Sequence, residues 1–310
     1  MSDPVVAELR RACVGRVVPE ASLADLTTLR VGGPARVLVW AERDEDLAAA
    51  GRACRDHGLG WLVVGRGSNL LVSDRGWPGV AIVLGRGFRS LAWSGTRVRA
   101  GAAEPLPTMA VRLAAAGYAG FAWASAVPGT LGGAVRMNAG AHGSDMARHL
   151  VVADLVRLRT GTRETWPTAT LGLGYRRSQL PDDAVVVAAE LELEGGDAAT
   201  IQAEIASIRA WRRAHQPLNQ PNCGSVFTNP PEDSAGRLVD AAGCKGLTVG
   251  GAAVSDRHAN FIVTRPGATA TDVATLITRV RDRVEERFGV RLQTEVCMVG
   301  DLEATGTGTP

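Results

Sequence analysis

Glycines are concentrated between residues 128 and 143, in the segment PGTLGGAVRMNAGAHG. Glycine loses more conformational entropy on folding than any other residue, so a segment this rich in glycine is costly to order. The cost is understandable where the backbone approaches a flat, extended ligand closely and a side chain would occupy the space. The segment therefore favours a loop that binds a phosphate group or a cofactor, with ordinary packing as the alternative.

A second loop, GRGSN at residues 65–69, directly follows an apolar stretch. Backbone N–H groups in such a loop can converge on an anion such as a pyrophosphate. The spacing is not that of a Rossmann fingerprint, because the loop leads into LLV at 70–72, which resembles a strand and not a helix. A tight β turn without a ligand is the alternative. GxxxxGK[ST] and GxSxG are both absent, which argues against P-loop ATP chemistry and a serine hydrolase.

The composition restricts the class of protein. With 310 residues, 45% of them hydrophobic, the chain can bury more than one core. Its net charge of +2 and scattered cations predict no nucleic-acid partner. No apolar run approaches the roughly 20 residues that span a membrane, so we expect a cytoplasmic protein without membrane insertion.

The five cysteines lack metal-ligand spacing, so we expect reduced thiols and no metal. The oligomeric state is not predicted.

Apolar stretches alternate with amphipathic ones, which predicts mixed α and β structure. Several predicted strands lack an intervening helix, so a purely parallel sheet is not expected. Helices are predicted at 44–57, 107–116, 199–215 and from Thr271 or Asp272 to about 289, the third of them as a spacer between domains. Strands are predicted at 36–40, 61–65, 80–84, 97–101, 151–159, 184–193, 247–254, 260–264 and 290–299.

Seven short motifs occur in order along the chain: VGGPA (31–35), GRGSN (65–69), VPGT (127–130), MNAG (137–140), YRRS (175–178), CGSVF (223–227) and AGCKG (242–246). In sequence and order they resemble the motifs of the UDP-N-acetylenolpyruvoylglucosamine reductase family, whose FAD enzymes complete UDP-N-acetylmuramate in peptidoglycan synthesis. The resemblance covers about residues 27–300.

The resemblance implies an α+β fold of the vanillyl-alcohol-oxidase (PCMH) type, with two FAD-binding subdomains and a C-terminal α+β substrate-binding domain. The predicted boundaries are 20–85 and 86–205 for the two subdomains, with 294–303 returning to the second, 206–293 for the substrate domain, and a disordered tail at 304–310. Noncovalent FAD is the implied cofactor, with NADPH as co-substrate and a UDP-sugar as substrate. The implied cofactor-binding residues are Gly65, Gly67, Ser68, Asn69, Pro128, Gly129, Gly132, Gly133, Asn138 and Gly140.

The implied reaction adds hydride to C3 of an enolpyruvyl ether and pushes negative charge onto the carboxylate at C2. Arg176 matches the family's catalytic arginine and can bind that carboxylate as a bidentate fork. Ser225 matches the serine that donates a proton to C2, which requires neighbouring charges to stabilise the alkoxide left behind. The alternatives are a surface ion pair for Arg176 and a turn position for Ser225.

Glu295 matches the family's catalytic glutamate, which orients or assists protonation of the substrate. Structural burial beside an arginine is the alternative for this acid. The family usually carries Glu-Val-Arg here, whereas this chain has Cys297 in the place of the arginine. The missing charge puts substrate affinity or the protonation of Glu295 in doubt.

Four further residues match substrate contacts of the family: Tyr175, Asn229, Lys245 and His258. Lys245 is the only lysine in the chain, and an ammonium point charge suits a diphosphate. A solvated turn is the alternative for His258. The chain resembles the shorter class of the family, which lacks an inserted loop whose tyrosine closes over the substrate, and the element that closes the cleft is not predicted.

Two other functions remain open at this point. One is an FAD-dependent sugar or alcohol oxidase of the same fold that uses oxygen as acceptor. The other is an inactive nucleotide-sugar-binding homologue, a possibility that Cys297 supports.

Overall fold

The computed structural model describes residues 3–302, which divide into two compact units built from segments distant in the sequence. The predicted tail at 304–310 lies outside the described residues. Unit 1 contains residues 3–19, 37–66 and 79–211, and unit 2 contains residues 20–36, 67–78 and 212–302. The finer division into two FAD-binding subdomains and a substrate domain stays a prediction.

Helices and strands alternate irregularly along the chain. The helices are α1 (Pro4–Ala12), α2 (Asp44–Asp56), α3 (Leu106–Ala115), α4 (Leu131–Met137), α5 (Ala198–His215), α6 (Ala235–Ala241) and α7 (Ala270–Phe288). The strands are β1 (Val17–Ser22), β2 (Pro34–Ala41), β3 (Trp61–Val64), β4 (Leu70–Val72), β5 (Trp77–Leu84), β6 (Leu91–Ser94), β7 (Arg97–Gly101), β8 (Gly140–Ala141), β9 (Ser144–Asp145), β10 (Leu150–Arg157), β11 (Arg163–Pro167), β12 (Ala184–Glu192), β13 (Thr248–Val249), β14 (Ala252–Val254), β15 (Ile262–Thr264) and β16 (Cys297–Val299).

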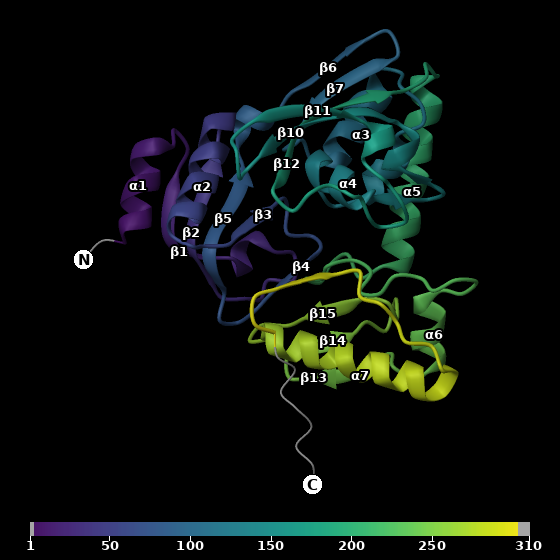
Figure 1. The fold of residues 1–310 in the computed structure, drawn as a ribbon. Coiled ribbons are helices and arrows are strands. Elements are labelled where there is room, and N and C mark those ends of the chain that lie inside the picture. The colour runs from purple at the N-terminus through teal and green to yellow at the C-terminus, as the bar shows by residue number, and fades with distance from the viewer. Residues whose placement is uncertain (1–2, 303–310) are drawn as a thin grey trace. The chain divides into compact units, whose positions relative to one another are not determined.

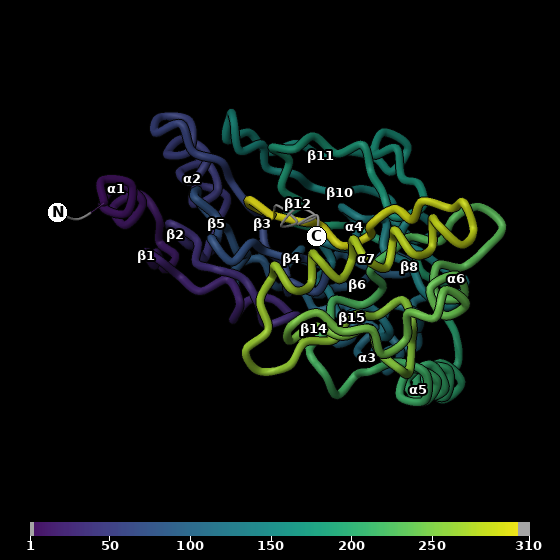
Figure 2. The backbone as a smooth tube through the Cα atoms, turned by 90° about the horizontal axis from the view of Figure 1, so that it is seen from below, coloured from purple at the N-terminus to yellow at the C-terminus, as the bar shows by residue number. Residues whose placement is uncertain are grey.

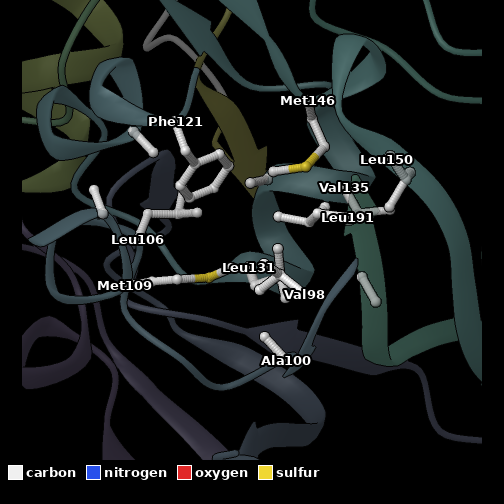
Figure 3. Close-up of a cluster of buried hydrophobic side chains, with 14 of the residues drawn as sticks. Val98, Ala100, Leu106, Met109, Phe121, Leu131, Val135, Met146, Leu150 and Leu191 are labelled. Carbon is white, nitrogen blue, oxygen red and sulfur yellow. The ribbon is translucent and has the colours of Figure 1, made fainter. Parts of the chain in front are cut away.

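The larger sheet of unit 1 is antiparallel throughout, in the order β11-β10-β12-β7-β6. Alternate residues of β7, β10 and β12 turn one face of this sheet toward α3, α4 and α5, because side chains along a strand point to opposite faces in turn. Figure 3 shows the buried side chains that fill this core, among them Phe121, Leu106 and Leu191. The prediction that a purely parallel sheet is absent is confirmed.

A second sheet, in the order β1-β2-β5-β3, carries the parallel pair β3 and β5. Helix α2 covers a core on this sheet, and α1 packs beside α2 (Figure 1). The predicted amphipathic helix at 44–57 is therefore confirmed, and its apolar residues Leu47, Ala50 and Cys54 are fully buried.

Unit 2 contains a small antiparallel sheet, β13-β14-β15, that packs against α7 (Figure 2). A capping box formed by Thr269 and Asp272 begins α7, so the predicted start at Thr271 or Asp272 is wrong by a few residues. Gly289, with a φ of +66°, ends α7 as predicted. Among the described residues, we find no helix both long and apolar enough to cross a membrane.

Two predicted strands are wrong in extent. Residues 247–254 form the two short strands β13 and β14, since the chain reverses at Gly250, whose φ is +50°. In the predicted strand 290–299 only β16 is a strand, while Thr294 makes an isolated bridge to Phe227. Within the glycine-rich segment, α4 was not predicted at all.

Gly51 of α2 provides a test of the packing in unit 1. A Cβ at Gly51 would lie 1.8 Å from the carbonyl oxygen of Leu158, so the backbones must separate to accept a side chain. We expect Gly51→Ala to lower the free energy of unfolding by about 1–3 kcal/mol. Gly195→Ala is the matched control, because nothing lies within 4 Å of its added Cβ. Equal midpoints for the two variants in urea denaturation would contradict this account.

Candidate active site

A cavity of about 400 Å³ lies within unit 1, beside β3 and the start of α4. This volume is in the range of small-molecule sites, about 300–1,000 Å³. Apolar strand residues form most of its wall, and three arginines add positive charge. The lining residues are Trp61, Leu62, Val63, Val64, Gly65, Arg66, Val83, Leu84, Arg89, Ala102, Ala103, Pro105, Thr130, Gly132, Gly133, Arg136, Asp182, Ala184, Val185 and Val186.

Glycines let the walls of this cavity approach one another. A Cβ added at Gly65 would lie 3.0 Å from Oγ1 of Thr130, and one added at Gly132 would lie 3.0 Å from Cβ of Ala102. Side chains at these positions would push β3 and β7 away from α4. The apolar walls, glycine contacts and arginine charges fit the nucleotide part of a cofactor such as FAD, which carries an aromatic base and a pyrophosphate.

The arginines at the cavity were not predicted. One edge of the Arg136 guanidinium is anchored, because Nη1 donates to the carbonyls of Leu180 at 3.2 Å and Pro181 at 2.8 Å. Arg66 and Arg136 lie within the glycine motifs, so a count of cations in those motifs would have found them. Arg89 lies outside every motif, and nothing in the sequence marks it.

The predicted cofactor residues fall into separate groups. Gly65, Gly132 and Gly133 line the cavity in unit 1, and Pro128 and Gly129 directly precede α4. Asn138 and Gly140 follow α4 and do not line the cavity. Gly67, Ser68 and Asn69 belong to unit 2. Whether each residue contacts a cofactor stays a prediction.

Arg176 lies at the tip of a tight turn in unit 1. The backbones of Gly174 and Arg177 exchange N–H···O hydrogen bonds of 3.0 and 3.2 Å around Tyr175 and Arg176. Arg176 has a φ of +55°, in the left-handed region that residues other than glycine adopt uncommonly. Its Nη2 donates to the carbonyl of Gly140 at 2.9 Å, and its guanidinium carbon lies 5.1 Å from the centre of the exposed Tyr175 ring. The turn thus holds a guanidinium against one carbonyl and one aromatic ring.

Ser225 and Glu295 lie on neighbouring extended segments of unit 2. The N–H of Glu295 donates to the carbonyl of Val226 at 2.8 Å, and the next residues bridge through Phe227 and Thr294. The pKa of the Cys223 thiol is raised to about 12, chiefly by burial and to a smaller extent by the carboxylate of Glu295. The thiol therefore stays protonated and does not act as a nucleophile. The structure brings these two predicted catalytic residues together, whereas Arg176 belongs to unit 1.

Two asparagines fix this arrangement in unit 2. The amide of buried Asn260 accepts from the N–H of Phe227 at 2.9 Å and donates to its carbonyl at 2.8 Å. Nδ2 of Asn69 donates to the carbonyl of Glu295 at 3.1 Å. Residues from three separate sequence motifs, Asn69, Ser225 and Glu295, therefore converge. Asn260 was not predicted, because a buried asparagine in an apolar stretch has no motif around it.

Three predicted substrate residues gather around α6. Oδ1 of Asn229 accepts from the N–H of Ala235 at the start of α6, at 3.0 Å. Nζ of Lys245 lies 2.6 Å from Oδ2 of Asp240 on the same helix. His258 packs beside the helix at Gly236, where an added Cβ would lie 3.4 Å from its ring.

His258 is held in its neutral form. Burial, and then the positive charges of Lys245 and His215, lower the pKa of His258 below its usual 6.5. Nδ1 accepts from the N–H of Asn260 at 3.2 Å, so the proton of the neutral ring is on Nε2. His258 can therefore donate a hydrogen bond from Nε2 without carrying charge.

Comparisons with known proteins match both parts of the chain. Residues 35–165 match a family model described as FAD binding domain, and residues 216–299 match one described as UDP-N-acetylenolpyruvoylglucosamine reductase, C-terminal domain. The reductase of Anaeromyxobacter sp. is 44% identical over 96% of this chain and 93% of its own length. That of Heliobacterium modesticaldum is 42% identical over 98% of each chain.

A solved structure supports the same family. The crystal structure of the reductase from Thermus caldophilus superposes with a TM-score of 0.82 at 36% identity, covering 92% of this chain and all of its own. The predicted α+β, PCMH-type FAD-binding fold is thereby confirmed. On this evidence, the chain belongs to the UDP-N-acetylenolpyruvoylglucosamine reductase family.

Proposed function

We propose that this chain reduces UDP-N-acetylenolpyruvoylglucosamine to UDP-N-acetylmuramate with FAD as cofactor and NADPH as reductant. The reaction serves peptidoglycan precursor synthesis, and we place it in the cytoplasm. The observation that supports this proposal most is the backbone pairing of the Ser225 segment with the Glu295 segment, because it brings two distant motifs, one with a hydroxyl and one with a carboxylate, onto neighbouring stretches of chain.

FAD, when bound, supplies a hydride carrier between NADPH and the substrate. The chain's own residues handle charge and protons. Arg176 binds the substrate carboxylate, where negative charge develops after hydride reaches C3. The hydroxyl of Ser225 gives its proton to C2, and Glu295 orients the carboxylate end of the substrate. Lys245 then balances the charge left on the serine oxygen or the diphosphate.

The UDP part of the substrate fits the residues around α6. Lys245, whose ammonium contacts Asp240 with one of its three N–H donors, offers a compact positive charge to the diphosphate. Neutral His258 offers its Nε2 proton, and Asn229 offers an amide. These contacts bind substrate and transition state alike, so their loss would raise KM more than it lowers kcat.

Anaerobic addition of NADPH, followed by the enolpyruvyl substrate, tests the proposal. We expect the flavin absorbance to bleach and then return. Rapid turnover with oxygen and no enolpyruvyl substrate would instead assign an oxidase of the same fold. A protein that holds no flavin, or whose flavin NADPH does not bleach, would be a binding protein.

Ser225→Ala separates the two half-reactions. We expect NADPH to bleach the flavin at the normal rate, while reoxidation by substrate slows by about 10²–10⁴-fold, the usual contribution of a general acid. Stopped-flow absorbance measures both rates. Ser207→Ala, an exposed serine of α5, is the control. Equal slowing of both half-reactions would remove the proton-donor role.

The environment of His258 predicts a pH dependence. We expect Lys245→Gln to raise the pKa of His258, since one of the charges that disfavour the protonated ring is removed. The stability contributed by neutral His258 is present above 6.5, the pKa of the unfolded chain, and is lost as the pH falls through the lower native pKa. NMR titration of the ring proton, assigned with His258→Asn, measures the pKa. An unchanged pKa in Lys245→Gln would show that burial alone sets it.

A further inference from the structure

We propose that Asn138 is a positioning residue, which sets the place of the Arg176 guanidinium through hydrogen bonds to the backbone around it. The inference rests on the proposed function, in which Arg176 binds the substrate carboxylate. It gives Asn138 a role different from the cofactor contact that its glycine-rich motif suggests.

The side-chain amide of Asn138 makes three hydrogen bonds within unit 1. Oδ1 accepts from the N–H of Ala147 at 2.9 Å, and Nδ2 donates to the carbonyl of Gly174 at 3.0 Å and to Oδ2 of Asp145 at 3.3 Å. An asparagine amide has two N–H donors, so both are used. A backbone N–H can only donate and a backbone carbonyl can only accept, which fixes the orientation of the amide. With 3% of its surface exposed, Asn138 has neither a donor nor open surface left for a cofactor.

These bonds join the two segments that meet at Arg176. Gly174 is the first residue of the turn that carries Tyr175 and Arg176. Asp145 belongs to β9, and β9 pairs with β8 through Gly140. The carbonyl of Gly140 in turn accepts from Nη2 of Arg176 at 2.9 Å. Asn138 therefore links the backbone before Arg176 to the strand pair that holds its guanidinium.

The backbone of Asn138 adds a second constraint. Its φ of 42° and ψ of 55° place it in the left-handed region at the end of α4. Asparagine and glycine enter this region most readily, so glycine can keep the backbone while removing the amide. The two contributions can thus be tested separately.

Loss of the hydrogen bonds of the Asn138 side chain should let the turn that carries Arg176 move, while the cavity keeps its shape. Displacing a catalytic group by about 1 Å can slow a reaction by about 10²-fold. The residues that line the cavity do not include Asn138, so FAD content and reduction by NADPH should change little. A residue that only stabilises the fold would not separate the two half-reactions in this way.

The decisive variants are Asn138→Asp and Asn138→Gly. Asn138→Asp keeps the size but sets a carboxylate against the carbonyl of Gly174 and the carboxylate of Asp145, and we expect flavin reoxidation by substrate to slow about 100-fold. Asn138→Gly keeps the backbone conformation, and we expect at least a tenfold loss. Both should keep FAD content and the NADPH rate within about twofold, and the KM for substrate should rise.

Two controls accompany them. Asp46→Asn alters another fully buried side chain of unit 1, whose carboxylate accepts from the N–H groups of Val14, Gly15 and Glu42. It should lower the melting midpoint, and the rates of flavin reduction by NADPH and of reoxidation by substrate should change by the same factor. The double variant Asn138→Asp with Asp145→Asn restores a donor and an acceptor between these two positions but not the bond to Gly174. We expect it to recover part of the lost thermal stability, because only the contact with residue 145 is restored, and not the reoxidation rate.

Three results would overturn the inference: normal reoxidation in both Asn138 variants, equal loss of FAD binding or NADPH reduction, or recovery of the rate in the double variant. An equal loss of FAD binding or NADPH reduction would indicate that Asn138 contacts the cofactor, as its motif predicts. Arg176→Lys distinguishes the proposals, since a normal reoxidation rate there would remove the proposed role of Arg176 itself. Slow reoxidation in Arg176→Lys together with normal Asn138 variants would overturn only the positioning role.

Discussion

The parallel pairing of β4 with β16 is the constraint on which unit 2 depends. It joins residues 70–72 to residues 297–299, and the flanking Asn69 and Glu295 are 226 positions apart in the sequence. Closing a loop of this length costs entropy that no local contact repays, so the pair must be stabilised by the core that Leu71 shares with α7. The predicted loop GRGSN and the predicted catalytic glutamate become neighbours through this pairing and through the hydrogen bond from Asn69 to the carbonyl of Glu295. The candidate site in unit 2 therefore depends on the completed fold and not on any local motif.

Both units use a buried asparagine to hold a functional segment. Asn260 binds the N–H and carbonyl of Phe227 beside Ser225, and Asn138 binds the carbonyl of Gly174 before Arg176 and the N–H of Ala147. A buried amide is costly unless all its hydrogen bonds are made, so each asparagine is compatible with one geometry of its neighbours. A side chain of the same size without donors and acceptors would fill the same space but would leave the segment free to shift.

The sequence predicts the elements with a clear period and misses those without one. The strand at 97–101 and the isoleucine face of α5 are confirmed. In both, the spacing of apolar residues along the sequence, two in a strand and 3.6 in a helix, follows from which side chains are buried. Helix α4 was not predicted, because glycine has a low helix propensity. In the structure Thr130 caps the helix, and the buried side chains of Leu131 and Val135 stabilise it. At the site, the glycine motifs include Gly65, Gly132 and Gly133, which line the cavity, but the strand residues of the cavity wall are marked by no motif. The glycine motifs do not predict whether an asparagine in the motif faces a ligand or the backbone, since that depends on the fold around Gly174.

Cys297, at the position where the resemblance leads us to expect arginine, can be understood in the same terms. Its N–H donates to the carbonyl of Asn69 at 3.0 Å, and its backbone begins β16. This hydrogen bond and the pairing with β4 use main-chain atoms of residue 297, which cysteine supplies as well as arginine does. The side chain of Cys297 is exposed, so a change from arginine to cysteine removes a surface charge and is compatible with the same strand register. An altered substrate affinity is therefore compatible with an unaltered arrangement of Asn69, Ser225 and Glu295.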